Sequence, residues 1–199
     1  MKIGIIPKII SRYNNQLEIS VEINLINFLK NVFKKSEIII LKDKKKINLD
    51  LIIISGGNDL IKFCKNKENL LRFNLDKYYF KQHFSKTPII GICYGAQFIA
   101  TRFKNIIIRK KTSLKKHRLF LKNKSIYVNS FHNNHIKKVD NIFEIKGTTI
   151  DGFIEYFHSK KKKILAIMWH PEREIVKKKF DKNLFKKFYA DSNSSFWKR

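Results

Sequence analysis

Cys93 has the setting of a catalytic nucleophile, because it stands between two glycines in the segment Gly91-Ile-Cys-Tyr-Gly95. An apolar run precedes this segment and a helical pattern follows it, which predicts a tight turn from a strand into a helix. Neighbours with little bulk allow such a turn to hold a reactive side chain, as in the nucleophile elbow of hydrolases. At the N-terminus of the helix, the helix dipole and unpaired backbone N–H groups favour thiolate over thiol. We therefore predict that Cys93 performs covalent catalysis.

A base for this nucleophile is predicted in the segment Trp169-His-Pro-Glu-Arg-Glu174, which follows an apolar, strand-like run. The imidazole of His170 would accept the thiol proton and return it to the leaving group, while the carboxylate of Glu172 orients the imidazole. Side chains two residues apart point to the same side of an extended chain. Pro171 stiffens the link between the two side chains. The sequence therefore predicts a triad of Cys93, His170 and Glu172.

An oxyanion site is predicted at the turn Ser55-Gly-Gly-Asn-Asp59, which also follows an apolar run. Strands of an open α/β sheet end where active sites form, so this turn and the Cys93 elbow are expected at one edge of a sheet. The glycines allow a close backbone approach, and the backbone N–H groups of Gly57 and Tyr94 are the predicted donors. Further candidate contacts to a substrate are Gly56, Asn58, Gln97, Asn129, Ser130 and His132.

The segment Asn129–His135 is a polar loop by its sequence, and it carries two histidines, His132 and His135. No cysteine or carboxylate lies at a spacing typical of zinc ligands, so we predict no metal site there. Substrate contact or hydrogen bonding within the loop is the expected role. The remaining histidines are predicted at the surface, and the second cysteine is predicted to be an apolar filler or an exposed bystander: His83, His117, His158 and Cys64.

The elements that must position these residues alternate between strands and helices in the first half of the chain. Strands are predicted at Lys2–Ile6, Glu37–Leu41, Leu51–Ser55 and Pro88–Ile92. Helical spacing of apolar residues occurs over Leu17, Val21, Leu25, Phe28, Leu29 and Val32, and again from about Leu70 to Phe84. This alternation implies right-handed crossovers and an α/β fold with a mostly parallel central sheet flanked by helices.

The second half of the chain is richer in strands. Apolar runs predict them at Asn105–Arg109, Ser125–Val128, Ile142–Ile145, Gly152–Phe157 and Ile164–Met168. A final helix is expected over Asp181–Ala190, followed by a loosely held tail, residues 191–199. The sequence contains no internal repeat or linker, and 199 residues suffice for one substantial core, so residues 1–199 are predicted to form a single catalytic domain.

The composition indicates a folded protein with a basic surface. Hydrophobic residues make up 43% of the chain, which excludes a disordered protein. Lys+Arg 43 against Asp+Glu 16 gives a net charge of +27. The lysines are spread along the whole chain, and Ile, Asn and Phe are also heavily used, a bias that an AT-rich coding sequence produces. We therefore interpret the charge as a solvated basic surface, from which an anionic substrate would benefit.

The cysteine count and the apolar runs predict the compartment. Two cysteines, Cys64 and Cys93, argue for a reducing environment and against a disulfide framework. The N-terminal run Met1–Pro7 is too short for the apolar core of a signal peptide. No apolar run approaches the roughly 20 residues of a membrane helix. We expect a cytoplasmic protein without a membrane partner.

The motifs together resemble the class I glutamine amidotransferase superfamily, in the segments Gly91–Gln97 and His170–Glu172. The resemblance covers nearly the whole chain and implies a flavodoxin-like fold with a Cys-His-Glu triad. The segments Ile167–Glu172, Ser55–Asp59 and Asp151–Glu155 are similar to the γ-glutamyl hydrolase branch, which is peptidase C26-like.

Within that branch, two segments resemble the bacterial γ-glutamyl-CDP-amidate hydrolases of capsule phosphoramidate biosynthesis: Val128–Asn133 and Met168–Glu174. This resemblance implies cleavage of a γ-glutamyl amide bond through a thioester on Cys93, giving glutamate and cytidine diphosphoramidate. The partner would be a small, nucleotide-linked γ-glutamyl substrate, and the chemistry requires no metal or organic cofactor.

Three alternatives differ in substrate or class. The first is a glutaminase subunit that supplies ammonia to a synthase partner, and only this alternative needs a protein partner. The second is a γ-glutamyl-amine hydrolase acting on γ-glutamyl-γ-aminobutyrate. The most distant is a non-catalytic nucleic-acid-binding protein on a retired hydrolase scaffold, which would explain the charge of +27 but not the retention of Cys93, His170 and Glu172.

Overall fold

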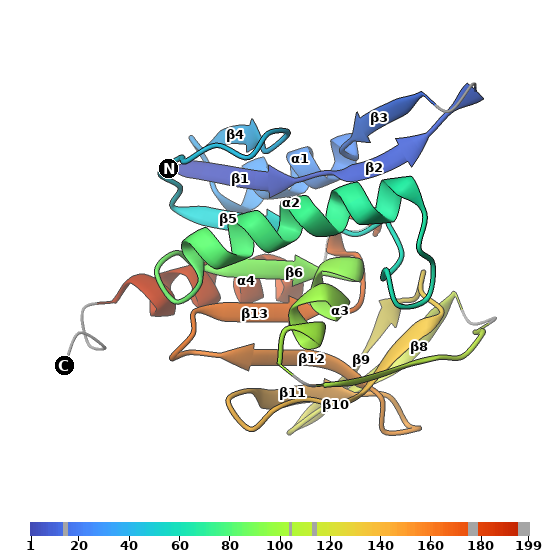
Figure 1. Cartoon of the computed structure of the whole chain (residues 1–199). Helices are drawn as coiled ribbons and strands as arrows, with labels where there is room; N and C mark the ends of the chain where they lie inside the picture. Colours follow the sequence, from blue (N-terminus) through green and yellow to red (C-terminus); the bar gives the residue numbers. More distant parts are fainter. Residues whose placement is uncertain (14–15, 104, 113–114, 175–178, 195–199) are drawn as a thin grey trace.

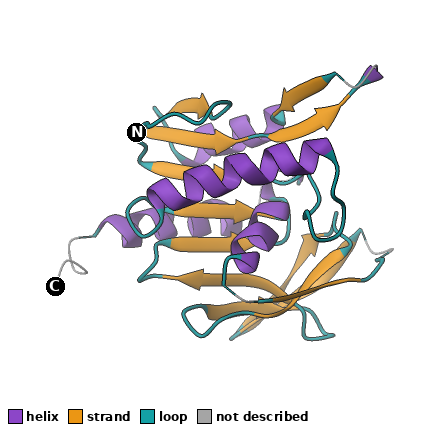
Figure 2. Ribbon diagram, viewed as in Figure 1, coloured by secondary structure: helices purple, strands orange, loops and turns teal. Residues whose placement is uncertain are grey.

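A computed structural model of the protein describes residues 1–13, 16–103, 105–112, 115–174 and 179–194. Helices cover both faces of the parallel part of one large sheet (Figures 1 and 2). The central strands are parallel, in the order β4 (Glu37–Ile40), β1 (Lys2–Ile6), β5 (Leu51–Ile54), β6 (Ile89–Ile92) and β13 (Ile164–Ile167). The predicted α/β fold with a parallel centre is confirmed.

Four helices pack on the two faces of this centre: α1 (Ile23–Val32), α2 (Lys67–His83), α3 (Tyr94–Thr101) and α4 (Lys179–Asn193), among the described residues. Successive residues of a strand point to opposite faces. Leu51 and Ile53 pack into the core beneath α1 and α4, whereas Ile52 and Ile54 pack into the core beneath α2 and α3. Burial on both faces explains why these strands are continuous apolar runs in the sequence rather than alternating patterns.

Beyond β13 the sheet continues as antiparallel strands. These are β12 (Ile154–Ser159), β11 (Glu144–Thr148), β8 (Lys116–Leu121) and β9 (Lys124–Asn129), with β10 (Asn134–Lys138) on β12 and β7 (Ile106–Arg109) on β10. Strands β8 and β10 were not predicted, because their lysines, histidines and asparagine hide the apolar alternation. His135 therefore lies in a strand and not in a loop.

A hairpin of β2 (Lys8–Ser11) and β3 (Leu17–Ser20) follows β1 and projects from the body of the sheet (Figure 1). The helix predicted from Leu17 is therefore wrong over its first turn and a half, and α1 begins at Ile23. Leu17 matches the helical spacing, but its backbone pairs with Ser11 in the hairpin. At the other end of the chain, α4 is longer than predicted, and residues 195–199 of the predicted tail lie outside the described residues.

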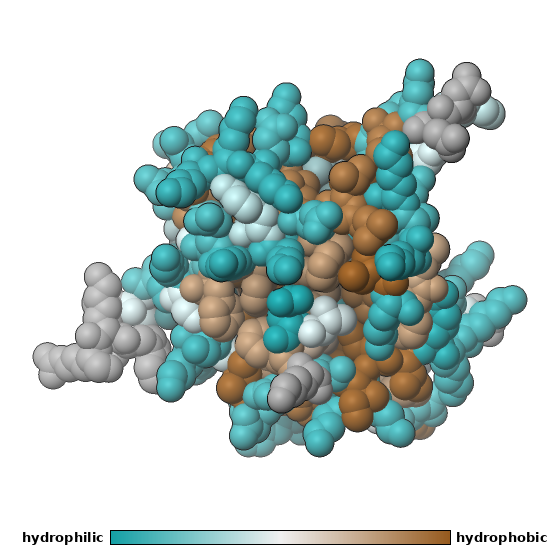
Figure 3. Space-filling view, in the orientation of Figure 1, coloured by the Kyte–Doolittle hydropathy of each residue, from teal (hydrophilic) through white to brown (hydrophobic). Residues whose placement is uncertain are grey.

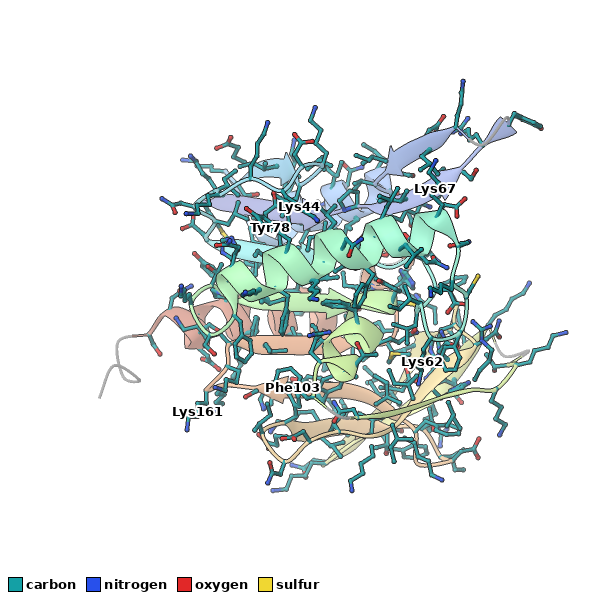
Figure 4. All side chains as sticks on the ribbon, viewed as in Figure 1. Lys44, Lys62, Lys67, Tyr78, Phe103 and Lys161 are labelled. Carbon is teal, nitrogen blue, oxygen red and sulfur yellow. The ribbon has the colours of Figure 1, made fainter. Side chains whose placement is uncertain are left out.

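The surface is basic over the whole molecule. Hydrophilic side chains cover most of the periphery of the face in Figure 3. Lys44, Lys67 and Lys161 project from separate regions of that face (Figure 4). In the described parts of the chain, no helix is both long enough and apolar enough to cross a membrane.

Candidate active site

Cys93 occupies a strained turn between β6 and α3. Its φ of 51° and ψ of −104° lie outside the regions that non-glycine residues ordinarily adopt. Its N–H donates to the carbonyl of Ile167 at 2.8 Å, and its carbonyl accepts from the N–H of Gln97 at 3.1 Å. A β-carbon at Gly95 would come 2.0 Å from the carbonyl oxygen of Ile54, so the turn fits against β5 only with glycine there. The predicted nucleophile elbow is present.

His170 and Glu172 meet beside this elbow, directly after β13 and at the start of the 3-10 helix η2 (Pro171–Arg173). The imidazole Nδ1 of His170 bonds to Oε1 of Glu172 at 2.5 Å, and both residues are almost fully buried. Because the carboxylate accepts this bond, Nε2 is the ring nitrogen available to a substrate or a thiol. A β-carbon at Gly56 would come 3.1 Å from His170 Nε2 and 3.5 Å from the β-carbon of Cys93. The turn after β5, the elbow and His170 therefore converge.

The electrostatics of this group favour a thiolate–imidazolium pair. Burial alone would raise the pKa of the Cys93 thiol, but the neighbouring His170, with which it is hydrogen-bonded, lowers that pKa below its usual value. Burial acts to lower the pKa of His170, yet Cys93 and Glu172 raise it to about 10. Each group thus stabilises the charged form of the other, which prepares the sulfur for nucleophilic attack.

Asn129 holds the backbone on which His170 sits. It ends β9, and its Oδ1 accepts from the N–H of His170 at 2.8 Å. Its Nδ2 donates to the carbonyl of His170 at 2.7 Å and to Oε1 of Glu174 at 2.9 Å. The sequence predicted that Asn129 contacts substrate. The structure commits both of its amide hydrogens to the segment around His170, so we assign it a positioning role.

A buried network that was not predicted from the sequence fixes the other side of the site. Arg72 of α2 is 0% exposed and donates to the carbonyls of Pro7 and Ser55 and to the carboxylate of Asp76. The hydroxyl of Tyr94 donates to Asp76 at 2.9 Å. This network ties the ends of β1 and β5 to the residue after the nucleophile. No signal marked it, because charged residues on a helix are usually solvated.

A pocket of about 400 Å³ opens onto the nucleophile, and its lining is Lys8, Ile9, Ile10, Gly57, Asn58, Cys93, Phe131, His170 and Arg173. Gly57 thus lies where predicted. The side chain of Asn58 instead binds the backbone N–H and carbonyl of Ile9, which ties the hairpin to the site. Arg173 was not predicted; its guanidinium bonds to Glu22 and stacks 4.8 Å from the Phe131 ring.

A larger pocket of about 520 Å³ lies on the other side of the segment that follows β9. Its lining includes Lys110, Lys111, Thr112, His117, Arg118, Phe120, Tyr127, Ser130, His132, His135, Asp151, Phe153 and Glu155. Ser130 and His132 face this pocket, whereas Phe131 between them faces the Cys93 pocket. The two predicted contacts Ser130 and His132 therefore lie in the larger pocket. Gln97 lies in neither lining; its Oε1 accepts from Asn134 at 3.0 Å.

Several predictions about the other histidines are wrong. His83 is 9% exposed, and the side chains of His117 and His158 are only 12% and 13% exposed, so none is a free surface residue. Glu155 supplies the carboxylate whose absence argued against a metal near His132 and His135, because β12 brings it beside them. Cys64 is partly buried and unpaired, in agreement with a filler role.

Comparison with known proteins identifies relatives for most of the chain. Residues 8–192 match the family model described as glutamine amidotransferase class-I. A γ-glutamyl-CDP-amidate hydrolase of Campylobacter jejuni is 36% identical over 124 residues, which cover 62% of this chain and 62% of that protein. A separate subunit of the glutamine-hydrolysing GMP synthase of Thermoplasma volcanium is 26% identical over 165 residues, covering 75% of each chain.

The matched regions leave parts of some relatives uncovered. The chain spans less than two thirds of the Campylobacter hydrolase and only 24% of a glutamine-hydrolysing GMP synthase from the same species, to which it is 29% identical. Among solved structures, a Thermoplasma acidophilum protein described as a GMP synthase subunit superposes with a TM-score of 0.72 at 22% identity. That superposition covers 96% of this chain and 94% of the other, and it shows a shared fold.

Proposed function

The chain belongs to the glutamine amidotransferase class-I family, and we propose that it hydrolyses a γ-glutamyl amide bond through a thioester on Cys93. One observation carries this proposal: the Cys93 thiol and the His170–Glu172 pair meet at the wall of a pocket that can admit a small substrate. The sheet continues without interruption from β4 to β9, which supports one catalytic domain over residues 1–199.

The proposed reaction has two steps. The Cys93 thiolate attacks the γ-carbonyl, and the backbone N–H groups of Gly57 and Tyr94 stabilise the oxyanion. His170, oriented by Glu172, protonates the departing nitrogen, and the amide bond breaks to leave a γ-glutamyl thioester. His170 then removes a proton from water, which attacks the thioester, releases glutamate and restores the thiolate.

The lining of the smaller pocket supports a glutamyl group as the acyl part. Lys8 and Arg173 place two cationic side chains around the nucleophile. A carboxylate forms stronger hydrogen bonds with such groups than with neutral donors. We propose that they bind the α-carboxylate, while the wall formed by Ile9 and Ile10 packs against the methylene groups of the substrate.

The larger pocket supports a nucleotide as the leaving group. Lys110, Lys111 and Arg118 suit a diphosphate, and the rings of Tyr127 and Phe153 suit a base. Together with the similarity to the Campylobacter γ-glutamyl-CDP-amidate hydrolase, this favours γ-glutamyl-CDP-amidate as substrate, with glutamate and cytidine diphosphoramidate as products. The enzyme would then act in the cytoplasm, in the synthesis of capsule phosphoramidate.

A second candidate is a glutaminase subunit that passes ammonia to a synthase. The similarity to GMP synthases, including a separate subunit whose match covers 75% of this chain, favours this alternative. It predicts free glutamine as the substrate and low activity without the partner. A third substrate, γ-glutamyl-γ-aminobutyrate, would leave the cationic pocket without a matching anion of comparable charge.

The test is glutamate release from γ-glutamyl-CDP-amidate, γ-glutamyl-γ-aminobutyrate and glutamine, with Cys93→Ala as the blank. We expect rapid release from the nucleotide substrate alone. Arg118→Ala should raise KM for that substrate, while Lys161→Ala, far from both pockets, should leave it unchanged (Figure 4). Release from glutamine only, and only with a synthase added, would replace the hydrolase proposal with the ammonia-supplying role.

A further inference from the structure

Three buried donor groups face one another beside the larger pocket. Ile136 of β10 pairs with Ile154 of β12, so His135 stands opposite Glu155 in the antiparallel register. His132 approaches from the segment before β10, and a donor atom from each of the three residues lies within 4.8 Å of the others. All three residues are more than nine-tenths buried. The cluster is distinct from the Cys93, His170 and Glu172 group.

The hydrogen bonds of the two histidines fix which ring nitrogen is free. Nδ1 of His132 lies 3.0 Å from the carbonyl oxygen of Asn134, and Nε2 of His135 lies 3.0 Å from the carbonyl oxygen of Lys110. A carbonyl only accepts hydrogen bonds, so each of these nitrogens carries the proton. The opposite nitrogens, Nε2 of His132 and Nδ1 of His135, then present lone pairs to the cluster. Metal-binding histidines commonly show this arrangement, with the second nitrogen bound to a backbone carbonyl or carboxylate.

The carboxylate of Glu155 has no satisfied partner. Within the part of the chain that the structure describes, both of its oxygens are buried without a hydrogen bond, and so are Nε2 of His132 and Nδ1 of His135. A buried carboxylate without hydrogen bonds is strongly destabilising unless a positive charge compensates it. Its oxygens lie 3.6 Å from His132 Nε2 and 3.4 Å from His117 Nε2, which is long for a charged hydrogen bond.

We propose that His132 Nε2, His135 Nδ1 and the Glu155 carboxylate form a binding site for a divalent transition-metal ion, with Zn²⁺ as the expected occupant. Zn²⁺ binds imidazole nitrogen and carboxylate oxygen at about 2.0–2.2 Å, so tetrahedral ligands lie about 3.4 Å apart. The spacing between His132 and Glu155 is close to that value. Two nitrogens and one oxygen favour Zn²⁺ over the harder Mg²⁺, which prefers oxygen ligands.

The fourth position of this site faces solvent. The larger pocket is lined by all three proposed ligands and by His117, so water, an anionic ligand or the His117 imidazole can complete the coordination shell. The sequence hid the site, because Glu155 follows His135 by 20 positions and only the β10–β12 pairing brings them together. The ion would compensate the buried carboxylate and fix the wall between the two pockets.

The experiment is titration of the metal-free, full-length protein with Zn²⁺ by calorimetry and with Co²⁺ by visible absorption. We expect one ion per chain and the intense d–d bands of tetrahedral Co²⁺, with no binding of Mg²⁺ at the same concentration. His132→Ala and Glu155→Gln should each weaken Zn²⁺ binding more than about 100-fold, because loss of an outer-shell partner alone costs about 10- to 100-fold. His158→Gln, a partly buried histidine outside the cluster, should bind as the wild type does.

Two controls keep the result decisive. Cys93→Ala should retain the site, because a Zn²⁺ bound between Cys93 and His170 would disappear in this variant and show a thiolate charge-transfer band with Co²⁺. Circular dichroism identifies variants that fail to fold, and the wild-type titration does not depend on them. Failure of the wild type to bind one Zn²⁺, or binding that Cys93→Ala abolishes, would overturn the proposal and leave Glu155 to be compensated by protonated histidines.

Discussion

Gly56→Ala is the sharpest test of how the catalytic group is assembled, because the added methyl group would enter the space of the His170 ring. The new β-carbon would lie 2.4 Å from Cε1 of His170. Carbon atoms in contact ordinarily stay about 3.5–4.0 Å apart, so the ring must move by roughly 1 Å or more. Gly56 itself is outside the left-handed region, so alanine adds no backbone strain there and the effect is steric.

The expected loss follows from this displacement. A misplacement of about 1 Å in a catalytic group costs about 100-fold in rate, which corresponds to about 2.7 kcal/mol in the activation free energy. The ring cannot yield freely, because Glu172 and Asn129 hold the side chain and the backbone of His170. We therefore expect kcat to fall about 100-fold, whereas overpacking lowers the free energy of unfolding by only about 1–3 kcal/mol.

The assay is glutamate release at saturating substrate, with thermal unfolding of the same preparations. Gly152→Ala is the matched control: its φ of 77° strains an added side chain, but no atom lies within 4 Å of the new β-carbon. It should lose stability and keep its kcat. A folded Gly56→Ala protein that turns over within about threefold of the wild type would refute the proposed crowding of His170.

Four further predictions concern the same site. Because His170 lowers the pKa of the Cys93 thiol, alkylation of Cys93 by iodoacetamide should be fast at neutral pH; in His170→Ala the pKa rises, and the rate should fall at least about tenfold. Turnover should rise with pH as the thiolate forms and fall near pH 10, where His170 loses its proton. Arg72→Met should lower the free energy of unfolding in urea by about 3–5 kcal/mol, since it leaves a buried carboxylate unpaired, while the exposed Lys77→Met changes it little. Asn129→Ala should reduce kcat by up to about 100-fold with little change in KM.

Each of these has a contrary result. Alkylation of Cys93 at one rate in wild type and His170→Ala would exclude the thiolate–imidazolium pair. Turnover that stays constant through pH 10 would show that the reaction does not need protonated His170. Equal urea midpoints for Arg72→Met and Lys77→Met would show that the buried network is dispensable. A higher KM with unchanged kcat in Asn129→Ala would return that residue to substrate binding.

The sequence predicts the parallel half of the fold well, because its strands are buried on both faces and carry little besides apolar residues. The elbow at Cys93 was also predictable, since the need for small neighbours is written into adjacent positions. In contrast, β8 and β10 escaped notice because each buries only part of its length and exposes lysines on the rest. Leu17 joined the wrong element because its spacing suits a helix as well as a hairpin strand.

The site residues that the sequence missed share one property: their partners are distant in the chain. Arg72 contacts Pro7 and Ser55, and Arg173 contacts Glu22. Their types suggest surface charge until the fold removes them from solvent. Glu155 is the clearest case, because spacing rules for metal ligands apply within one loop and not across a sheet.

Cys93 is proposed to carry a γ-glutamyl thioester during turnover, and every step of the mechanism depends on this intermediate. The most direct measurement is rapid acid quenching of the working enzyme with a γ-glutamyl substrate, followed by peptide mass spectrometry. We predict a glutamyl adduct on the peptide that contains Cys93, absent from Cys93→Ala and cleared when the substrate is exhausted. Turnover without any such adduct, or an adduct on Cys64 alone, would contradict the proposed mechanism.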